Sequence, residues 1–296
     1  MVITPNVPNL PYQLLDGIKH FELIAEPVQQ EILPGVFLQA WGYNGTTPGP
    51  TILVCPGDWV NIRVYNRLPV ATSVHWHGLD IPNVMDGVPE VEPSPRIEPG
   101  CYFDYRFRIV NPPGTHMYHA HYQTVRQEMM GLSGGLIILE PTQSPAGPDY
   151  FMMLHEFHAN GLDKGIVRPG SYSLDPISDM FNFFTINGRC YPYTSPLPVA
   201  SGDQVKLRLA NVGMNAHPMH LHGHQFIISA SDGNTIAPCN RLTKNTIPVA
   251  SGETFDIEFT ANNPGIWPFH CHIPHHVANN FTDPTGGMFT TVIYQR

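Results

Sequence analysis

A cysteine flanked by two histidines, His270-Cys271-His272, is the most chemically informative feature of this sequence. Side chains alternate between two faces along a strand, so Cys271 should point to one side and both neighbours to the other. A soft thiolate, two imidazoles and a distant thioether form a blue-copper electron-transfer site. Cys271 and His276 can supply two of these ligands, and Met288 the weak axial one. A buried structural cysteine among unrelated histidines is the alternative interpretation.

The second half of the sequence repeats the first. The pattern Gly-Asp-x-Val-x-x-Arg-x-x-Asn begins at Gly57 and again at Gly202. The same offset relates two histidines of the first repeat to two of the second, and a slightly larger offset relates two more. Such self-similarity indicates two copies of one structural unit.

Each repeat therefore carries two His-x-His pairs at matching positions, and clustered histidines indicate a metal site. The first-domain histidines are His75, His77, His119 and His121, and the second-domain histidines are His220, His222, His270 and His272. Neutral imidazole suits copper, zinc and iron alike, and the adjacent thiolate favours copper. His217 supplies the missing imidazole for Cys271 and His276, and these three residues are called the thiolate site below.

Alternation of apolar and polar residues predicts half-buried strands in both halves. The clearest apolar sets are Val60, Ile62, Val64; Phe103, Tyr105, Phe107; Val205, Leu207, Leu209; and Phe255, Ile257, Phe259. No long helical period appears. The stretch 140–149 contains three prolines and is the best linker candidate. We therefore predict an all-β protein with two β-sandwich domains, residues 1–143 and 144–296.

Composition excludes several classes of protein. The formal charge of −9 disfavours nucleic acid as a partner. No apolar run approaches the ~18 residues that a membrane span needs. No signal peptide is visible at residues 1–5, so the protein is either cytosolic or its leader lies outside this numbering. Cys55, Cys101, Cys190 and Cys239 could form two disulfides or remain thiols, and spacing does not decide between them.

Four segments resemble the copper-binding motifs of multicopper oxidases. They are His75-Trp-His77-Gly, His119-Ala-His121, His217-Pro-Met-His220-Leu-His222-Gly-His224 and His270-Cys271-His272-x-x-x-His276. The resemblance covers nearly the whole chain, and the two-domain length is similar to that of small laccases. It implies two cupredoxin-like Greek-key β-sandwiches and four coppers per chain, comprising one type 1, one type 2 and two type 3 ions.

The resemblance also implies which residues bind each copper. The thiolate site would hold the type 1 copper, and His75 and His220 the type 2 copper. The type 3 pair would be held by His77, His119, His121, His222, His270 and His272. In the first repeat, the places of His217, Cys271 and His276 are taken by Thr72, Ala120 and Val125, so the first domain should lack a type 1 copper.

Three positions need separate treatment. The family's usual spacing places the axial ligand at Phe281, whereas allowing for the insert at 277–287 places it at Met288, which we prefer because the following strand fixes its position in the repeat. Asp86 matches the family's acid beside the trinuclear site and is the candidate for proton delivery; a turn-forming Asp-Gly is the alternative. The family often has another acid after the last type 1 histidine, where this chain has Val277.

The function implied is a laccase-like oxidase. It would couple one-electron oxidation of phenols or aromatic amines at the type 1 copper to reduction of O2 to water at a trinuclear cluster. Rival functions are a metal-ion oxidase for Cu(I), Fe(II) or Mn(II), a copper nitrite reductase, and a non-enzymatic copper electron shuttle. The insert at 277–287 contains one acid, Asp283, and no methionine, which favours organic substrates over metal ions.

Assembly and location follow from the same resemblance. A short linker need not bring the two sets of paired histidines face to face within one chain. A head-to-tail ring would do so, because the first domain of one chain would meet the second domain of the next. We therefore expect a homotrimer with trinuclear clusters between chains, and a periplasmic or secreted protein.

Overall fold

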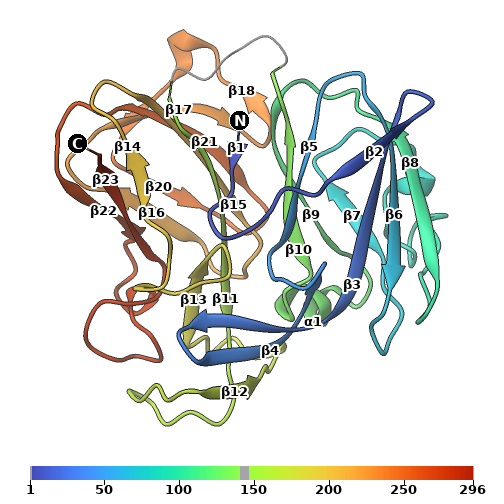
Figure 1. Cartoon of the computed structure of the whole chain (residues 1–296), viewed down its shortest axis with the longest axis horizontal. Helices are drawn as coiled ribbons and strands as arrows, with labels where there is room; N and C mark the ends of the chain where they lie inside the picture. Colours follow the sequence, from blue (N-terminus) through green and yellow to red (C-terminus); the bar gives the residue numbers. More distant parts are fainter. Residues whose placement is uncertain (1, 141–146, 296) are drawn as a thin grey trace.

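The computed structural model describes residues 2–140 and 147–295. Its regular secondary structure is almost entirely β-strand, arranged as two sandwiches side by side (Figure 1). The predicted all-β class and two-domain cupredoxin-like architecture are confirmed. The predicted boundary between residues 143 and 144, and most of the predicted linker, lie outside the described residues.

The first sandwich packs a six-stranded sheet against a four-stranded one. The six-stranded sheet contains β2 (Tyr12–Leu15), β3 (Ile18–Leu33), β4 (Val36–Tyr43), β6 (Trp59–Asn66), β8 (Tyr102–Arg108) and β12 (Gly170–Ser173). The four-stranded sheet contains β5 (Gly49–Val54), β7 (Val74–His77), β9 (Gly114–Ala120) and β10 (Ser133–Ile138). Two short helical turns, η1 (Asn83–Met85) and α1 (Thr124–Met129), lie in its connections. The alternating apolar residues of β6 and β8 point into this core, as predicted.

The second sandwich packs an eight-stranded sheet against a five-stranded one. The eight-stranded sheet contains β1 (Val2–Ile3), β11 (Asp149–Phe157), β13 (Phe183–Ile186), β15 (Gln204–Asn211), β17 (Phe226–Ser231), β18 (Asn234–Thr235), β19 (Thr243–Lys244) and β21 (Thr254–Thr260). The five-stranded sheet contains β14 (Leu197–Val199), β16 (His217–Leu221), β20 (Thr246–Val249), β22 (Ile266–Cys271) and β23 (Phe289–Tyr294). The short helical turns η2 (Pro238–Asn240) and η3 (Pro274–Val277) lie in the connections of this domain.

Two short strands cross between the domains. The N-terminal β1 pairs in parallel with β11 of the second sandwich, and β12 pairs in parallel with β4 of the first (Figure 1). Each covers strand-edge groups that would otherwise be unpaired. The residues of each sequence half thus complete a sheet of the other half.

A buried ionic cluster also joins the domains. Arg208 on β15 makes a two-pronged pair with Asp149 at 2.7 and 2.9 Å and a further bond to Asp256 at 3.1 Å. Thr115, on β9 of the first sandwich, donates to Asp256 at 2.6 Å and accepts from Arg208 at 2.9 Å. The strand that leads to His119 is therefore anchored to the second domain.

The cysteine question is resolved in favour of thiols. Cys55, Cys101, Cys190, Cys239 and Cys271 are all free, so this structure contains no disulfide among them. Among the described residues, no helix is long and apolar enough to cross a membrane.

Candidate metal centres

The thiolate site gathers residues from three elements of the second domain. His217 begins β16, Cys271 ends the neighbouring β22, and His276 lies in η3. The two imidazole Nδ1 atoms are 3.2 Å apart, and the Cys271 Sγ lies 3.8 and 3.4 Å from those of His217 and His276. All three side chains are buried. Three ligand atoms each about 2 Å from one ion would be separated by similar distances, and this donor set suits copper.

The protonation states of His276 and Cys271 suit a metal site. Burial, together with the nearby His217 and His275, lowers the pKa of His276 to about 3. Burial raises the pKa of the Cys271 thiol to about 12, an effect that the Glu156 carboxylate strengthens. The imidazole is therefore neutral and free to coordinate, whereas the sulfur keeps its proton until a cation replaces it.

Glu156 on β11 holds the His217 imidazole from behind. The His217 Nε2 lies 2.9 Å from the Glu156 Oε2, so it is Nδ1 that faces Cys271. Backbone N–H groups of Met214 and Asn215 donate to the other carboxylate oxygen at 2.5 and 2.8 Å. Burial alone would raise the pKa of Glu156, but the hydrogen bond and charge of His217 and the Asn215 N–H hold it below its usual value.

The two candidates for the axial ligand occupy different environments. Met288 is fully buried and belongs to the same core cluster as Cys271. Its backbone carbonyl accepts from the Cys271 N–H at 3.0 Å, and its N–H donates to the His276 carbonyl at 2.9 Å. Phe281 is 38% exposed and stacks on the His275 ring instead.

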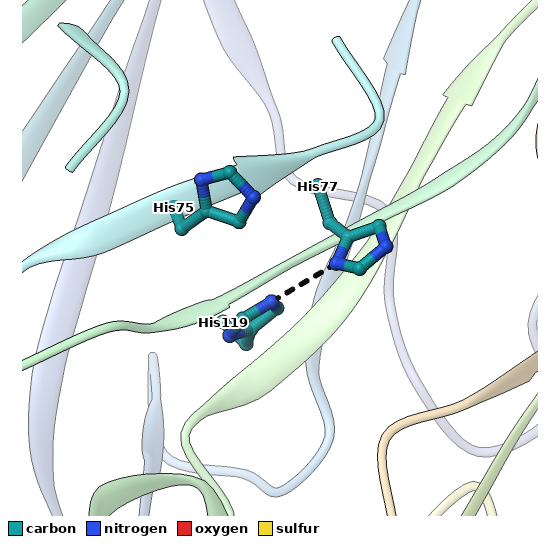
Figure 2. A group of neighbouring side chains, drawn as sticks. All are labelled: His75, His77 and His119. Atoms are coloured by element: carbon teal, nitrogen blue, oxygen red, sulfur yellow. Dashed lines mark hydrogen bonds between the residues drawn. The ribbon is translucent and has the colours of Figure 1, made fainter. Parts of the chain in front are cut away.

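The first-domain histidines cluster at one end of the sheet formed by β7 and β9. His75 lies directly opposite His119 across these antiparallel strands. His77 lies two residues further along β7. Figure 2 shows the rings of His75, His77 and His119 turned toward a common space, with His77 Nδ1 and His119 Nε2 3.2 Å apart. The His121 ring lies 5.4 Å from that of His75.

Two acids orient these rings from outside the cluster. The Glu128 carboxylate, on α1, contacts His119 Nδ1, which leaves Nε2 facing inward. Both the backbone carbonyl and the carboxylate of Asp86 approach His75 Nδ1, at 3.0 and 3.3 Å. Burial and the neighbouring histidines lower the pKa of His75, and they lower that of His77 to about 4. Both rings are thus neutral near pH 7.

The second-domain histidines repeat this arrangement on β16 and β22. His220 lies opposite His270 across the strands, as His75 lies opposite His119. The Nε2 atoms of His222 and His270 are 3.0 Å apart, while His220 Nδ1 binds the Asn245 carbonyl and the Thr246 hydroxyl at 2.8 Å each. The His272 ring lies 5.5 Å from that of His220. Burial and nearby histidines lower the pKa values of His222 and His270.

The two histidine sets line different cavities of the chain. The first-domain set lines a cavity of 290 Å³ whose second-domain wall is Val212, Ser251 and Gly252, none of which is a metal ligand. His220 and His222 line a separate cleft of 320 Å³. Among the described residues, no histidine ring of the first-domain set contacts a histidine ring of the second-domain set. The two sets do not meet within the chain.

The first domain fills the place of the thiolate site with a hydrogen bond. Thr72, the counterpart of His217, donates to the Gln127 side chain at 2.7 Å, and both are buried. Ala120, the counterpart of Cys271, is packed in the core. This polar pair has no soft ligand for a type 1 copper.

Sequence reasoning missed three residues that contact candidate ligands. Glu156 binds His217, Glu128 contacts His119, and the Phe184 ring stacks on that of His276 at 3.9 Å. One signal for Glu156 was available, because it lies in Tyr150–Phe157, where every other residue except His155 is apolar, and an acid in such a strand is rarely buried without a partner. His224 is hydrogen-bonded beside the second-domain histidines: its ring binds the His222 carbonyl at 3.1 Å and the Tyr294 hydroxyl at 2.7 Å.

Comparisons with known protein families agree with the copper chemistry that these sites suggest. Two models, each described as multicopper oxidase, match residues 25–143 and 165–283. A solved structure described as the multicopper oxidase mgLAC superposes with a TM-score of 0.81 at 31% identity, covering 93% of this chain and 86% of that one.

Two curated proteins are similar over most of this chain. One is a probable nitrite reductase-hydroxylamine oxidoreductase fusion protein of Kuenenia stuttgartiensis, 30% identical over 89% of this chain and 31% of its own length. The other is Laccase-3 of Arabidopsis thaliana, 30% identical over 85% of this chain and 45% of its own length. The chain thus spans less than half of either relative.

Proposed function

Because the chain belongs to the multicopper oxidases, a family of copper-dependent oxidases, we propose that it is a laccase-like enzyme. It would couple one-electron oxidation of phenols or aromatic amines to four-electron reduction of O2 to water. Copper, when bound, would supply the redox chemistry, and the protein would supply ligand geometry, reduction potential and protons.

One observation carries this proposal: Cys271 belongs to the thiolate site while its two sequence neighbours belong to the second-domain histidines. One peptide bond joins Cys271 to each of these two histidines, so the thiolate site is linked covalently to the place where O2 would be reduced. An electron shuttle would need the thiolate site alone and would leave the eight paired histidines without a role.

The ligand assignments are part of the proposal. The thiolate site would hold type 1 copper, with Met288 as the axial ligand. His75 and His220 would hold type 2 copper, and the other six paired histidines the type 3 pair. The close approaches of His77 to His119 and of His222 to His270 support this division, since each joins two expected type 3 ligands. Each chain would then bind four coppers.

We further propose a head-to-tail homotrimer in which each cluster lies between chains. The wall of the first-domain cavity supports this arrangement, because the second-domain residues there are Val212, Ser251 and Gly252 rather than histidines. A second chain would supply the missing histidines through a heterologous contact, and a ring of three would close the assembly.

A cavity beside the thiolate site supports organic reductants. It has a volume of 440 Å³, and its lining includes Phe184, His275 and Phe281. The Phe184 ring contacts both His275 and His276, so an aromatic guest would lie close to a ligand edge. The lining holds two imidazoles, His158 and His275, one carboxylate, Asp179, and one thioether, Met180. None of these belongs to a group of three close metal-binding side chains among the described residues.

Two alternatives within the family are tested with the same assay. The similarity to copper resistance protein A of Pseudomonas syringae pv. tomato, at 28% identity over 74% of this chain, favours including metal ions among the substrates. The nitrite reductase relative favours including nitrite as an oxidant.

A periplasmic or secreted location is proposed on family resemblance and is tested by cell fractionation.

The deciding experiment is O2 consumption by copper-loaded protein against phenols, aromatic amines, Cu(I), Fe(II) and Mn(II), with nitrite as a competing acceptor. We expect uptake driven best by the organic substrates, without release of hydrogen peroxide. Cys271→Ser is the matched control and should abolish both turnover and the thiolate absorption band. Wild-type protein that binds a single copper and consumes no O2 would establish the shuttle instead.

A further inference from the structure

A fully buried acid, Glu156, lies behind the thiolate site without being one of the proposed copper ligands. Glu156 lies on β11, in the sheet opposite the strands that carry His217 and Cys271, and both it and His217 have no exposed side-chain surface. Among the described residues, its only ion-pair partner is the His217 imidazole. Lysine and arginine do not neutralise it.

The surroundings of Glu156 are built for a carboxylate. It accepts hydrogen bonds from the backbone N–H groups of Met214 and Asn215 and from His217 Nε2. Gly213 lets the backbone come this close, because a Cβ at that position would overlap the Glu156 carboxylate. The two backbone N–H groups share one carboxylate oxygen, and His217 Nε2 faces the other. When His217 Nδ1 holds a metal, Nε2 carries the ring proton and donates, so all three contacts then favour the carboxylate form.

We propose that Glu156 is a positioning residue that fixes His217 and sets the reduction potential of the copper held at the thiolate site. The inference rests on the proposed function of that site. A buried negative charge stabilises Cu(II) over Cu(I), because reduction removes one unit of positive charge close to it. The single electron accepted on reduction requires no proton, so the charge of Glu156 acts on the potential directly. Its hydrogen bond also holds the ring in the tautomer that presents Nδ1.

The test compares reduction potentials of copper-loaded Glu156→Gln, Glu156→Asp and wild type, measured by redox titration of the thiolate absorption band. Glu156→Gln removes the charge with little change of shape. At a fixed solution potential, its ratio of reduced to oxidised copper should rise about tenfold, which is about 59 mV for one electron. Glu156→Asp keeps the charge and should stay within about threefold of wild type. Asp104→Asn, which removes a paired carboxylate in the first domain, is the matched control and should not change the ratio.

Each result supports or overturns the inference. A retained band with a rise below about threefold in Glu156→Gln, or an equal rise in Glu156→Asp, would show that the charge does not set the potential. If Glu156→Gln fails to fold, Glu156→Asp decides. A ratio within about threefold of wild type supports the inference, because the charge is kept, and a larger rise overturns it. Loss of the band in folded Glu156→Gln would show a structural role instead, because all three ligands remain. Absence of the band in wild type would overturn the proposed function itself, which separates the two failures.

Discussion

Met288 and Phe281 compete for one role at the thiolate site, and their surroundings favour Met288. It is fully buried beside Cys271 and is bonded through its backbone to both Cys271 and His276, whereas Phe281 lies at the surface beneath the Lys164 ammonium. Met288→Leu should therefore raise the type 1 potential and alter its absorption spectrum, because a weak thioether ligand is lost. Redox titration of both variants checks this assignment. An effect of Phe281→Leu without one of Met288→Leu would reverse it.

Proton release should accompany metal binding at the thiolate site. Burial raises the pKa of Cys271 to about 12 and lowers that of His276 to about 3. Between pH 5 and pH 8 the thiol is therefore protonated and the His276 imidazole neutral, so binding displaces the thiol proton. The apparent copper affinity of the site should rise about tenfold per pH unit over this window.

Titration of metal-free protein with copper in a weakly buffered indicator solution measures this release. Cys271→Ser should release about one proton fewer per chain than wild type. Equal release from both proteins would mean that Cys271 is not a ligand.

We expect Asp86 to deliver protons to the proposed trinuclear cluster. Its carboxylate and carbonyl both approach His75 Nδ1. Asp86→Asn should slow O2 reduction by about a hundredfold while slowing reduction by substrate far less, because protons are needed only where O2 reacts. Stopped-flow measurement of the two half-reactions distinguishes them. Asp80→Asn, at an exposed acid bonded to Asn111, is the control, and equal slowing of both half-reactions in Asp86→Asn would indicate a folding role.

At the scale of elements, β9 carries both a candidate ligand and an anchor to the second domain. Thr115 of this strand joins the buried cluster of Arg208, Asp149 and Asp256. Arg208→Ala would leave two buried carboxylates uncompensated and should lower the free energy of unfolding by about 3–5 kcal/mol. Denaturant unfolding of the metal-free protein measures the loss.

The matched control for this prediction is Arg63→Ala. The Arg63–Asp104 pair has similar two-pronged geometry but lies about one-third exposed on the first sandwich. Its removal should cost about 0–1 kcal/mol. Equal losses for both arginine variants would show that the interdomain cluster contributes no more than a surface pair.

The sequence predicts the strands of this fold better than their connections between domains. Alternation predicts β6 and β15, and the offset repeats predict that the histidine pairs occupy equivalent positions in the two halves. The structure agrees, with His75 opposite His119 and His220 opposite His270. The crossing strand β1 has only two residues, and β12 is short and polar, so neither carries a periodic signal. Their pairing depends on tertiary contacts, which outweigh local preference.

The candidate sites divide in the same way. His270-Cys271-His272 is a local motif whose geometry follows from strand alternation alone. Glu156 is distant in sequence from His217, and the two meet only because β11 packs behind β16. Nothing in the spacing of the motif indicates which strand supplies that partner.

At the scale of the whole molecule, the proposed trinuclear cluster would need a partner chain, because the two histidine sets line separate cavities of one chain. Each set is preorganised on its own pair of strands, but the first-domain cavity meets only Val212, Ser251 and Gly252 of the second domain. If three chains close head to tail, wild-type protein should be a trimer by light scattering. Copper should stabilise that trimer, because binding at an interface favours the assembled state.

Complementation between inactive variants tests the interchain cluster most directly. One variant carries His75→Ala and His77→Ala, the other His270→Ala and His272→Ala, and each alone should consume no O2. When differently tagged chains are refolded together and mixed trimers are isolated, each mixed ring should contain one interface with both intact half-sites, which is about one in three. The account predicts about a third of wild-type O2 consumption per chain in the isolated mixed trimers. Mixed trimers that stay inactive, together with a fully active wild-type monomer, would contradict it and place the cluster within one chain.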